Sequence, residues 1–239
     1  DYVIGWGDGS HVESSTTDLV AHTYSSGNYS INIETNAAYR PYFNDVSTDV
    51  DQITTVSIRS GATLGTSLQN AWKGANNMTS FVCDATTTTG VTNFSYSWCN
   101  CSSLTSFPAV DTSNGLDFSY AWENCSGLTI FPTLTTTSGT NFAYAWFSCS
   151  SLTAFPTLTY TNATNFSYAW NSCTNLATFP SGVFNTTGTL ASNAFSYCWT
   201  GCALTAQSIE NILTSLDTNG QSNIYLDLNG GTNADASTW

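Results

Sequence analysis

Hydrophobic and polar residues return in the same order at a fixed interval along most of the chain. Six tryptophans mark this order, and successive ones are 26, 24, 24, 24 and 29 residues apart: Trp72, Trp98, Trp122, Trp146, Trp170 and Trp199. Each of the last five has a Phe four positions before it and a Tyr two positions before it. Periods of this length are typical of solenoids and arrays, in which a single unit cannot bury its own apolar face. We therefore expect one stacked coil per tryptophan.

Within a coil, the pattern predicts three short segments. A Cys three positions and a Leu five or six positions after Trp continue the apolar spacing, which predicts a short helical turn with one buried face. The following Leu-Thr-x-Phe-Pro predicts an extended piece that ends at the proline, and Thr, Ser, Asn and Gly then turn the chain back. We expect ladders of Phe, Trp, Cys, Leu and Phe inside, with the tryptophans more than about 90% buried.

The repeated pattern also carries a family resemblance. Asn-Phe-Ser-Tyr-Ala-Trp-x-x-Cys-Ser-Ser-Leu-Thr-x-Phe-Pro resembles the BspA-like leucine-rich repeat family, in the variant found in mycoplasma surface lipoproteins and in marine bacterial and phage proteins. The resemblance covers about residues 67–204, with Trp where the family usually has Phe. It implies a leucine-rich-repeat-like solenoid over residues 51–204, with short parallel strands, short helical turns and coils of about 24 residues.

The N-terminal 50 residues interrupt the repeat and are expected to form β structure. The Trp6-Gly7-Asp8-Gly9-Ser10 turn and the alternating residues 29–33 resemble the second half of a PKD-type β-sandwich whose opening strands are missing, so an upstream part is expected. A polar connector at residues 37–51 follows, and residues 53–58 are predicted to be the first strand of the solenoid. Residues 1–50 are thus assigned as a partial PKD-like segment with its connector.

The C-terminal residues 205–239 also leave the repeat. Ile209, Ile212, Leu213 and Leu216 form the apolar stripe of a helix that ends near Gly220. Residues 224–228 are predicted to be a strand. Together these elements are expected to form a cap that shields the last coil.

Charge and polarity narrow the classes of partner. The chain has 3 Lys and Arg residues against 16 Asp and Glu residues, a net charge of -13 that would repel a nucleic acid. No stretch approaches the about 20 apolar residues of a membrane span. Polarity comes from Ser, Thr, Asn and Gly instead, which favours a virion surface or an extracellular or cell-surface location.

The eight cysteines invite a metal or disulfide interpretation. Five of them recur in one slot, and one thiol per coil gives a row rather than a tetrahedral cage, so we expect reduced, buried thiols there. A disulfide between Cys83 and Cys99 stays open. Calcium could bind near Asp8, or near Asp45, Asp49 and Asp51, although ordinary turn chemistry accounts for these residues as well. We expect no cofactor and no metal.

Catalysis is not expected either. The regular coils carry only the acidic residues Asp111, Asp117 and Glu123, and both histidines, His11 and His22, lie in the N-terminal segment. A hydrolase needs paired carboxylates or a nucleophile with a base. We assign no catalytic residue.

The sequence therefore favours a non-enzymatic virion or cell-surface protein that acts in recognition or adhesion, as in a phage receptor-binding or tail-fibre module. Its partner would be a surface glycan or a protein receptor. The exposed positions of the extended segments are the candidate contact surface, although solvated spacers are an equal alternative: Thr105, Ser106, Thr129, Ile130, Thr153, Ala154 and Thr178. The alternative function is a structural virion decoration protein or fibre segment, whose partners are capsid or tail subunits or copies of itself in a homo-oligomer.

Overall fold

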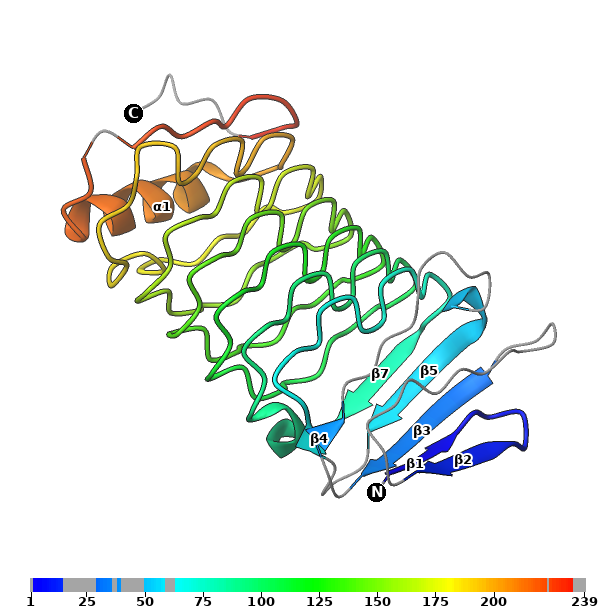
Figure 1. Ribbon diagram of the computed structural model, residues 1–239. Coiled ribbons are helices and arrows are strands. Elements are labelled where there is room, and N and C mark those ends of the chain that lie inside the picture. The colour runs from blue at the N-terminus through cyan, green and yellow to red at the C-terminus, as the bar shows by residue number, and fades with distance from the viewer. Residues whose placement is uncertain are drawn as a thin grey trace.

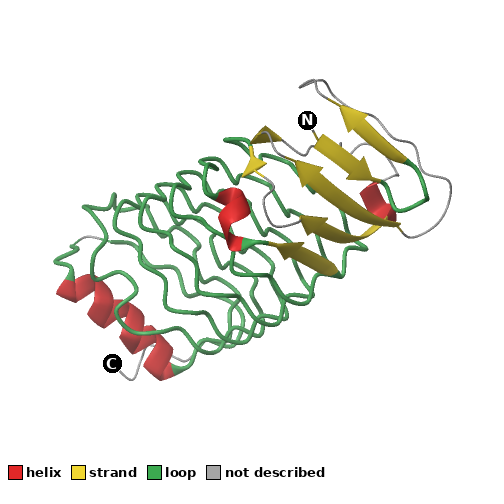
Figure 2. Cartoon of the chain, turned by 90° about the horizontal axis from the view of Figure 1, so that it is seen from below, coloured by secondary structure: helices red, strands yellow, loops and turns green. Residues whose placement is uncertain are grey.

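Most of the chain winds into coils that stack on one another between an N-terminal sheet and a C-terminal helix (Figures 1 and 2). This computed structural model describes residues 2–14, 29–35, 38–39, 50–58, 63–222 and 224–233. The stacking follows from the sequence period, because residues 24 apart form parallel bridges, such as Asn93 with Asp117 and Asp117 with Asn141. The coils are therefore in the register that the tryptophans predict.

The N-terminal segment joins the coils through one continuous sheet. Its strands have the order β2-β1-β3-β5-β7: β1 (Tyr2–Gly5), β2 (His11–Ser14), β3 (Tyr29–Thr35), β5 (Ile53–Ile58) and β7 (Ser80–Cys83). The pairs β1–β2 and β1–β3 are antiparallel, whereas β3–β5 and β5–β7 are parallel. The strands predicted at residues 29–33 and 53–58 are confirmed, and β3 pairs directly with the first strand of the stack.

Four further short elements lie in this part of the chain. The strands β4 (Ala38–Tyr39) and β6 (Thr63–Leu64) form a separate parallel pair. The short 3-10 helices are η1 (Val50–Gln52) and η2 (Ala85–Thr88), and η2 begins where the Asp84 side chain accepts a hydrogen bond from the Thr86 amide.

The segment around each tryptophan is a run of overlapping turns, so the predicted helical turn is wrong. In the second coil, the amides of Tyr96 and Trp98 donate to carbonyls of the next coil, at 3.0 and 2.8 Å, whereas the amide of Cys99 donates back to Tyr96 within its own coil, at 3.3 Å. A helix is excluded because residues two before and two after Trp adopt positive φ, as at Tyr96 (57°) and Asn100 (64°). Alternate amides thus tie successive coils together.

The extended segments contain less strand than expected. Between residues 84 and 204, their pairing is limited to single parallel bridges, Ser106 with Ile130 and Ala154 with Thr178. Each of these segments ends in a proline, which has no amide hydrogen to continue a ladder. Regular strand pairing stops at β7, whose segment carries Val82 where later coils carry proline.

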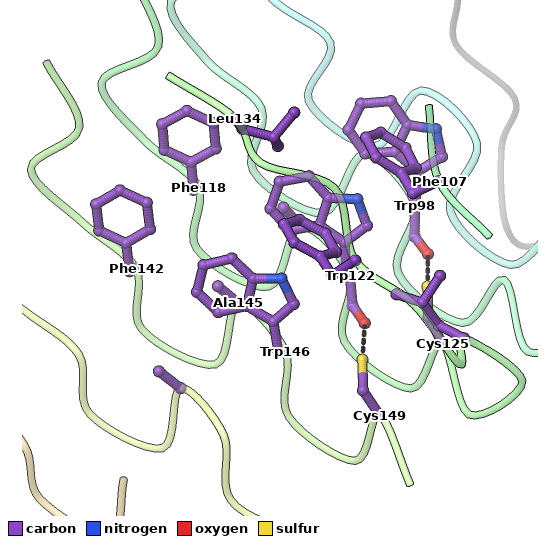
Figure 3. Packing of buried hydrophobic residues seen from close by; sticks show 14 of the residues in the cluster. Trp98, Phe107, Phe118, Trp122, Cys125, Leu134, Phe142, Ala145, Trp146 and Cys149 are labelled. Carbon is purple, nitrogen blue, oxygen red and sulfur yellow. Dashed lines mark hydrogen bonds between the residues drawn. The ribbon is translucent and has the colours of Figure 1, made fainter. Parts of the chain in front are cut away.

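The interior consists of stacked aromatic ladders (Figure 3). All six repeat tryptophans are at most 1% exposed, which confirms the predicted burial. Their rings stack at centroid distances of 5.2 to 5.6 Å, for example 5.6 Å between Trp98 and Trp122. Phe131 packs edge-on against Trp122 at 4.8 Å. None of the six indole N–H groups has a hydrogen-bond partner among the described residues.

The last tryptophan is covered by half a coil that lacks large aromatics at the core positions. The predicted strand at residues 224–228 is wrong, because this segment has no regular secondary structure. Its end follows the repeat: the Gly201 amide donates to the Asn229 carbonyl at 2.9 Å, as Ser172 does to Thr200 one coil earlier. Ile224, Leu226 and Leu228 thereby take the positions of Phe, Tyr and Trp. Smaller side chains end the ladder.

The helix α1 (Ala206–Thr218) closes the other side of the last coil and confirms the predicted helix. Ile209, Ile212 and Leu216 are buried, as the apolar stripe requires, while Leu213 is 41% exposed. A polar stripe was not predicted and replaces the missing next coil. Its side chains form hydrogen bonds with backbone groups of residues 177–190 that would otherwise have no partner. They belong to Ser208, Asn211 and Ser215 in the helix and to Asn219 and Gln221 after it.

Removing one member of this stripe should destabilise the array. The Ser215 hydroxyl accepts from the Phe184 amide at 2.7 Å and donates to Asn185 at 2.9 Å. Ser215→Ala leaves a buried amide unpaired, so we expect the free energy of unfolding to fall by about 1–3 kcal/mol. Thr214→Ala, at the exposed neighbouring position, should change it by less than about 0.5 kcal/mol. Urea unfolding of both variants tests this, and equal effects would rule out the capping role.

Candidate recognition surfaces

The structure exposes all seven candidate contact residues, and it aligns them along the stack. They come from the same two slots of successive extended segments, and the bridges Ser106–Ile130 and Ala154–Thr178 hold neighbouring coils in register. The row continues into the N-terminal sheet, where Ser80 of β7 pairs with Thr55 of β5. We call the seven residues and Ser80 the contact face.

The contact face presents methyl groups and oxygen acceptors rather than charges. The Thr129 hydroxyl donates to the Thr105 carbonyl at 3.1 Å, and Thr79 donates to Thr54 at 3.2 Å, so these hydroxyl protons are used within the stack. Ile130 is 70% exposed at the centre of the face, and Val82 of β7 is 52% exposed. An aliphatic side chain held that far into solvent is available to a partner.

The acidic residues of the coils serve the turns. Asp111 accepts a hydrogen bond from the Ser113 amide at 2.9 Å, and its bonds with Ser113 lower the pKa of this carboxyl. Asp117 accepts from the Ser119 amide at 2.9 Å. Asn93 and Asn165 take the same turn position in other coils, which accounts for the Asn-Phe-Ser sequence there.

A second surface, which the sequence analysis missed, is formed by the repeat tyrosines. Their rings stack face to face at centroid distances of 4.4 to 4.9 Å: Tyr96, Tyr120, Tyr144, Tyr168 and Tyr197. The first four are half-buried and Tyr197 is 46% exposed. We call these five residues the tyrosine ridge. Burial raises the pKa of Tyr96, Tyr120 and Tyr144, so their phenols stay protonated at neutral pH. The sequence contains one sign of this exposure, because Tyr carries a polar hydroxyl that the Phe and Trp rings of the interior ladders lack.

The cysteine slot, the position three residues after Trp, holds five thiols that are not reactive. Each of its five thiols donates to the carbonyl of the preceding coil's tryptophan, as Cys125 does to Trp98 and Cys149 to Trp122, both at 3.2 Å (Figure 3). Burial raises the pKa of Cys125 to about 12. Since the thiolate is the nucleophile and the metal ligand, these groups are protonated and inert near neutral pH.

Cys83 and Cys99 point to different partners. The Cys83 thiol donates to the Asp84 carbonyl at 3.4 Å, and burial raises its pKa to about 11. The Cys99 thiol donates to a Glu123 carboxylate oxygen at 3.2 Å, and burial, followed by the charge of Glu123, raises its pKa. Both are free thiols.

The titratable side chains nearest the ridge do not form a reactive set. Lys73 lies over the Tyr96 ring, with Nζ 5.5 Å from the centroid, and Glu123 accepts the hydrogen bond from Cys99. A carboxylate beside a buried thiol suppresses its ionisation rather than promoting it. The arrangement provides no activated nucleophile.

The candidate metal positions are occupied by turn contacts or lie outside the described residues. Asp8 accepts from the amide and the hydroxyl of Ser10, at 2.9 and 2.5 Å. Asp51 belongs to η1, whereas Asp45 and Asp49 lie outside the described ranges, as does His22. Among the described residues, no three His, Cys, Asp or Glu side chains gather where they could share a metal ion.

Comparison with protein-family models, with curated proteins and with solved structures finds no match to this chain. Within the described part of the chain, no helix has the length and apolarity that crossing a bilayer requires.

Proposed function

We propose that the protein is a non-enzymatic recognition or adhesion module of a virion or cell surface, and that it binds through the contact face. The observation that carries this proposal is the alignment of seven exposed, uncharged residues along one row of the stack, with Ile130 70% exposed at its centre. Stacked coils repeat the same environment, which suits weak contacts summed along a surface.

The same repetition argues against catalysis. A reactive site needs an acid and a base, or a nucleophile and a base, in separately tuned environments. In the coils, the five thiols of the cysteine slot hydrogen-bond to carbonyls, and the carboxylates of Asp111 and Asp117 hold turns. The variable positions are those that face solvent on the row, where Ser106, Ile130 and Ala154 occupy one slot. Variation of this kind changes binding without changing the core.

Placing charge on the contact face should abolish attachment. The double variant Thr129→Glu and Thr153→Glu adds two carboxylates to an uncharged row. A bound partner would remove water from these carboxylates, and the contact face has no cation to compensate their charge. We expect attachment of the labelled protein to its host cells or to the virion shell to fall at least tenfold, with a nearly unchanged unfolding temperature. Thr157→Glu, at an exposed position beyond the proline, is the matched control.

Normal attachment of the Thr129/Thr153 variant would remove this face from consideration. Cleavage of a polysaccharide by the purified protein would overturn the non-enzymatic interpretation. If the variant instead changes from an oligomer to a monomer while attachment is retained, the face joins copies of the chain and the recognition role is excluded.

A further inference from the structure

Each coil has two positions with a left-handed backbone, and they are filled by different kinds of residue. The position two after Trp has φ between 55° and 86°, and it carries only Gly, Asn or Ser: Gly74, Asn100, Asn124, Ser148, Ser172 and Gly201. The position two before Trp has φ between 55° and 59° in five coils and carries Tyr each time. Asn and Gly adopt this conformation most readily, whereas a bulky residue is strained there.

The left-handed backbone therefore does not explain why Tyr fills the position two residues before Trp. In the first coil the same position is filled by Asn70, with φ of 58°, so a small polar residue satisfies the fold there. The interior does not need the rings either, because the Trp and Phe ladders already fill it and the tyrosines lie outside, half-buried. Stacking compensates part of the strain, but Phe would stack equally well. In the five coils that carry Tyr, the feature that Tyr has and Phe lacks is a hydroxyl.

The ridge presents these hydroxyls in a row, one from each coil, with neighbouring tyrosines on adjacent coils. Because the rings stack at 4.4 to 4.9 Å, their faces cover one another and the outer edges remain for a ligand. Among the described residues, the charged groups near the ridge are one cation, Lys73, and two anions, Asp117 and Glu123, beside its first half. A row of neutral donors and acceptors at a regular spacing fits a neutral polymer whose hydroxyls also repeat.

We propose that the tyrosine ridge binds a neutral polysaccharide chain that lies along the stack. Within the ridge, Tyr96 and Tyr120 share a side-chain hydrogen bond, and so do Tyr144 and Tyr168, so each phenol offers its remaining donor or acceptor to a sugar. Successive sugars meet successive tyrosines, and weak contacts sum along the ridge. An anionic polymer is disfavoured by the net charge of -13. The ridge consists of residues that are absent from the contact face, so this inference goes beyond the proposed function and can fail or hold independently of it.

Affinity electrophoresis tests the proposal, because the acidic protein migrates in native gels and a bound polymer retards it. The gels contain hydroxyethylcellulose, galactomannan, mannan or dextran, with alginate as the anionic comparison. Tyr120→Phe, Tyr144→Phe and Tyr168→Phe together keep the stack and remove three hydroxyls. We expect the wild type to be retarded by at least one neutral polymer, and the Phe variant to bind it at least about tenfold more weakly.

A second variant separates binding from folding. Tyr→Asn at the same three positions removes the rings and places there the residue that Asn70 provides in the first coil, so the backbone is not strained. It should lose retardation completely, while the Thr129/Thr153→Glu variant should keep it. Absence of retardation by every neutral polymer, equal retardation of the wild type and the Phe variant, or stronger retardation by alginate would each overturn the proposal.

Discussion

Trp122→Ala is expected to lower the free energy of unfolding by about 3–5 kcal/mol, the range measured for deleting a buried aromatic side chain. The Trp122 indole is 1% exposed and stacks between Trp98, at 5.6 Å, and Trp146, at 5.5 Å. Removing it leaves a cavity in the middle of the ladder and breaks contacts with the coils on both sides. Typical domains have only about 5–15 kcal/mol in total, so much of the stability would be lost.

Trp122→Phe is the informative companion to this truncation. It keeps a ring in the stack and removes an indole N–H that has no acceptor among the described residues, which relieves an unmet hydrogen bond of about 1–3 kcal/mol. We expect it to lose less than half of what the Ala variant loses. Urea unfolding followed by far-ultraviolet circular dichroism measures both. A loss below about 1 kcal/mol for the Ala variant would show that the ladder is not the core.

The interior was predictable because it depends on apolar spacing. The tryptophan period set the stacking register, and a residue repeated in every coil has to be buried together with its copies, as at Trp98 and Trp146. The local backbone was harder. The 3-to-4 spacing from Phe94 to Cys101 suits a helix, but the left-handed positions at Tyr96 and Asn100 exclude it. Gly and Asn recurring two residues after Trp were the available signal.

The cap itself was predicted, and its helix is confirmed, but its polar contacts were missed because they depend on hydrogen bonds rather than burial. In α1, Ser208 and Ser215 lie seven residues apart on the face that meets the last coil, and they bind its amides. Apolar spacing alone does not reveal such a stripe. In the last half coil, Leu226 and Leu228 alternate as in a strand, yet Gly230, with φ of 74°, gives the segment the turn geometry of the repeat. The repeat tyrosines were left out of the expected interior ladders, and no role was predicted for them.

Alkaline pH is expected to destabilise the protein steeply above about pH 9 through its buried thiols. The pKa of the thiols of Cys125 and Cys202 rises from the ordinary value of 9.0 to about 12 because burial disfavours the thiolate, and Cys101, Cys149, Cys173 and Cys198 are shifted in the same direction. The unfolded chain releases these protons from about pH 9, whereas in the folded chain Cys125 and Cys202 retain theirs to about pH 12 and the other four also retain theirs above the ordinary value. Their contribution is therefore complete below pH 9 and is lost between pH 9 and 12.

The size of this effect follows from the number of thiols. At pH 10, one unit above the ordinary thiol pKa, each protected thiol costs the folded state about 1 kcal/mol, so the six together remove several kcal/mol, a large part of a typical total stability. Removing two of the six, with Cys125→Ala and Cys149→Ala, should reduce the loss between pH 8 and pH 10 by about a third, measured against that variant's own stability at pH 8. Urea unfolding at both pH values gives these differences. A wild-type stability that stays flat from pH 8 to pH 10, or native thiols whose ultraviolet absorbance titrates near pH 9, would mean that the cysteine ladder is open to water and that the coils are not packed as described.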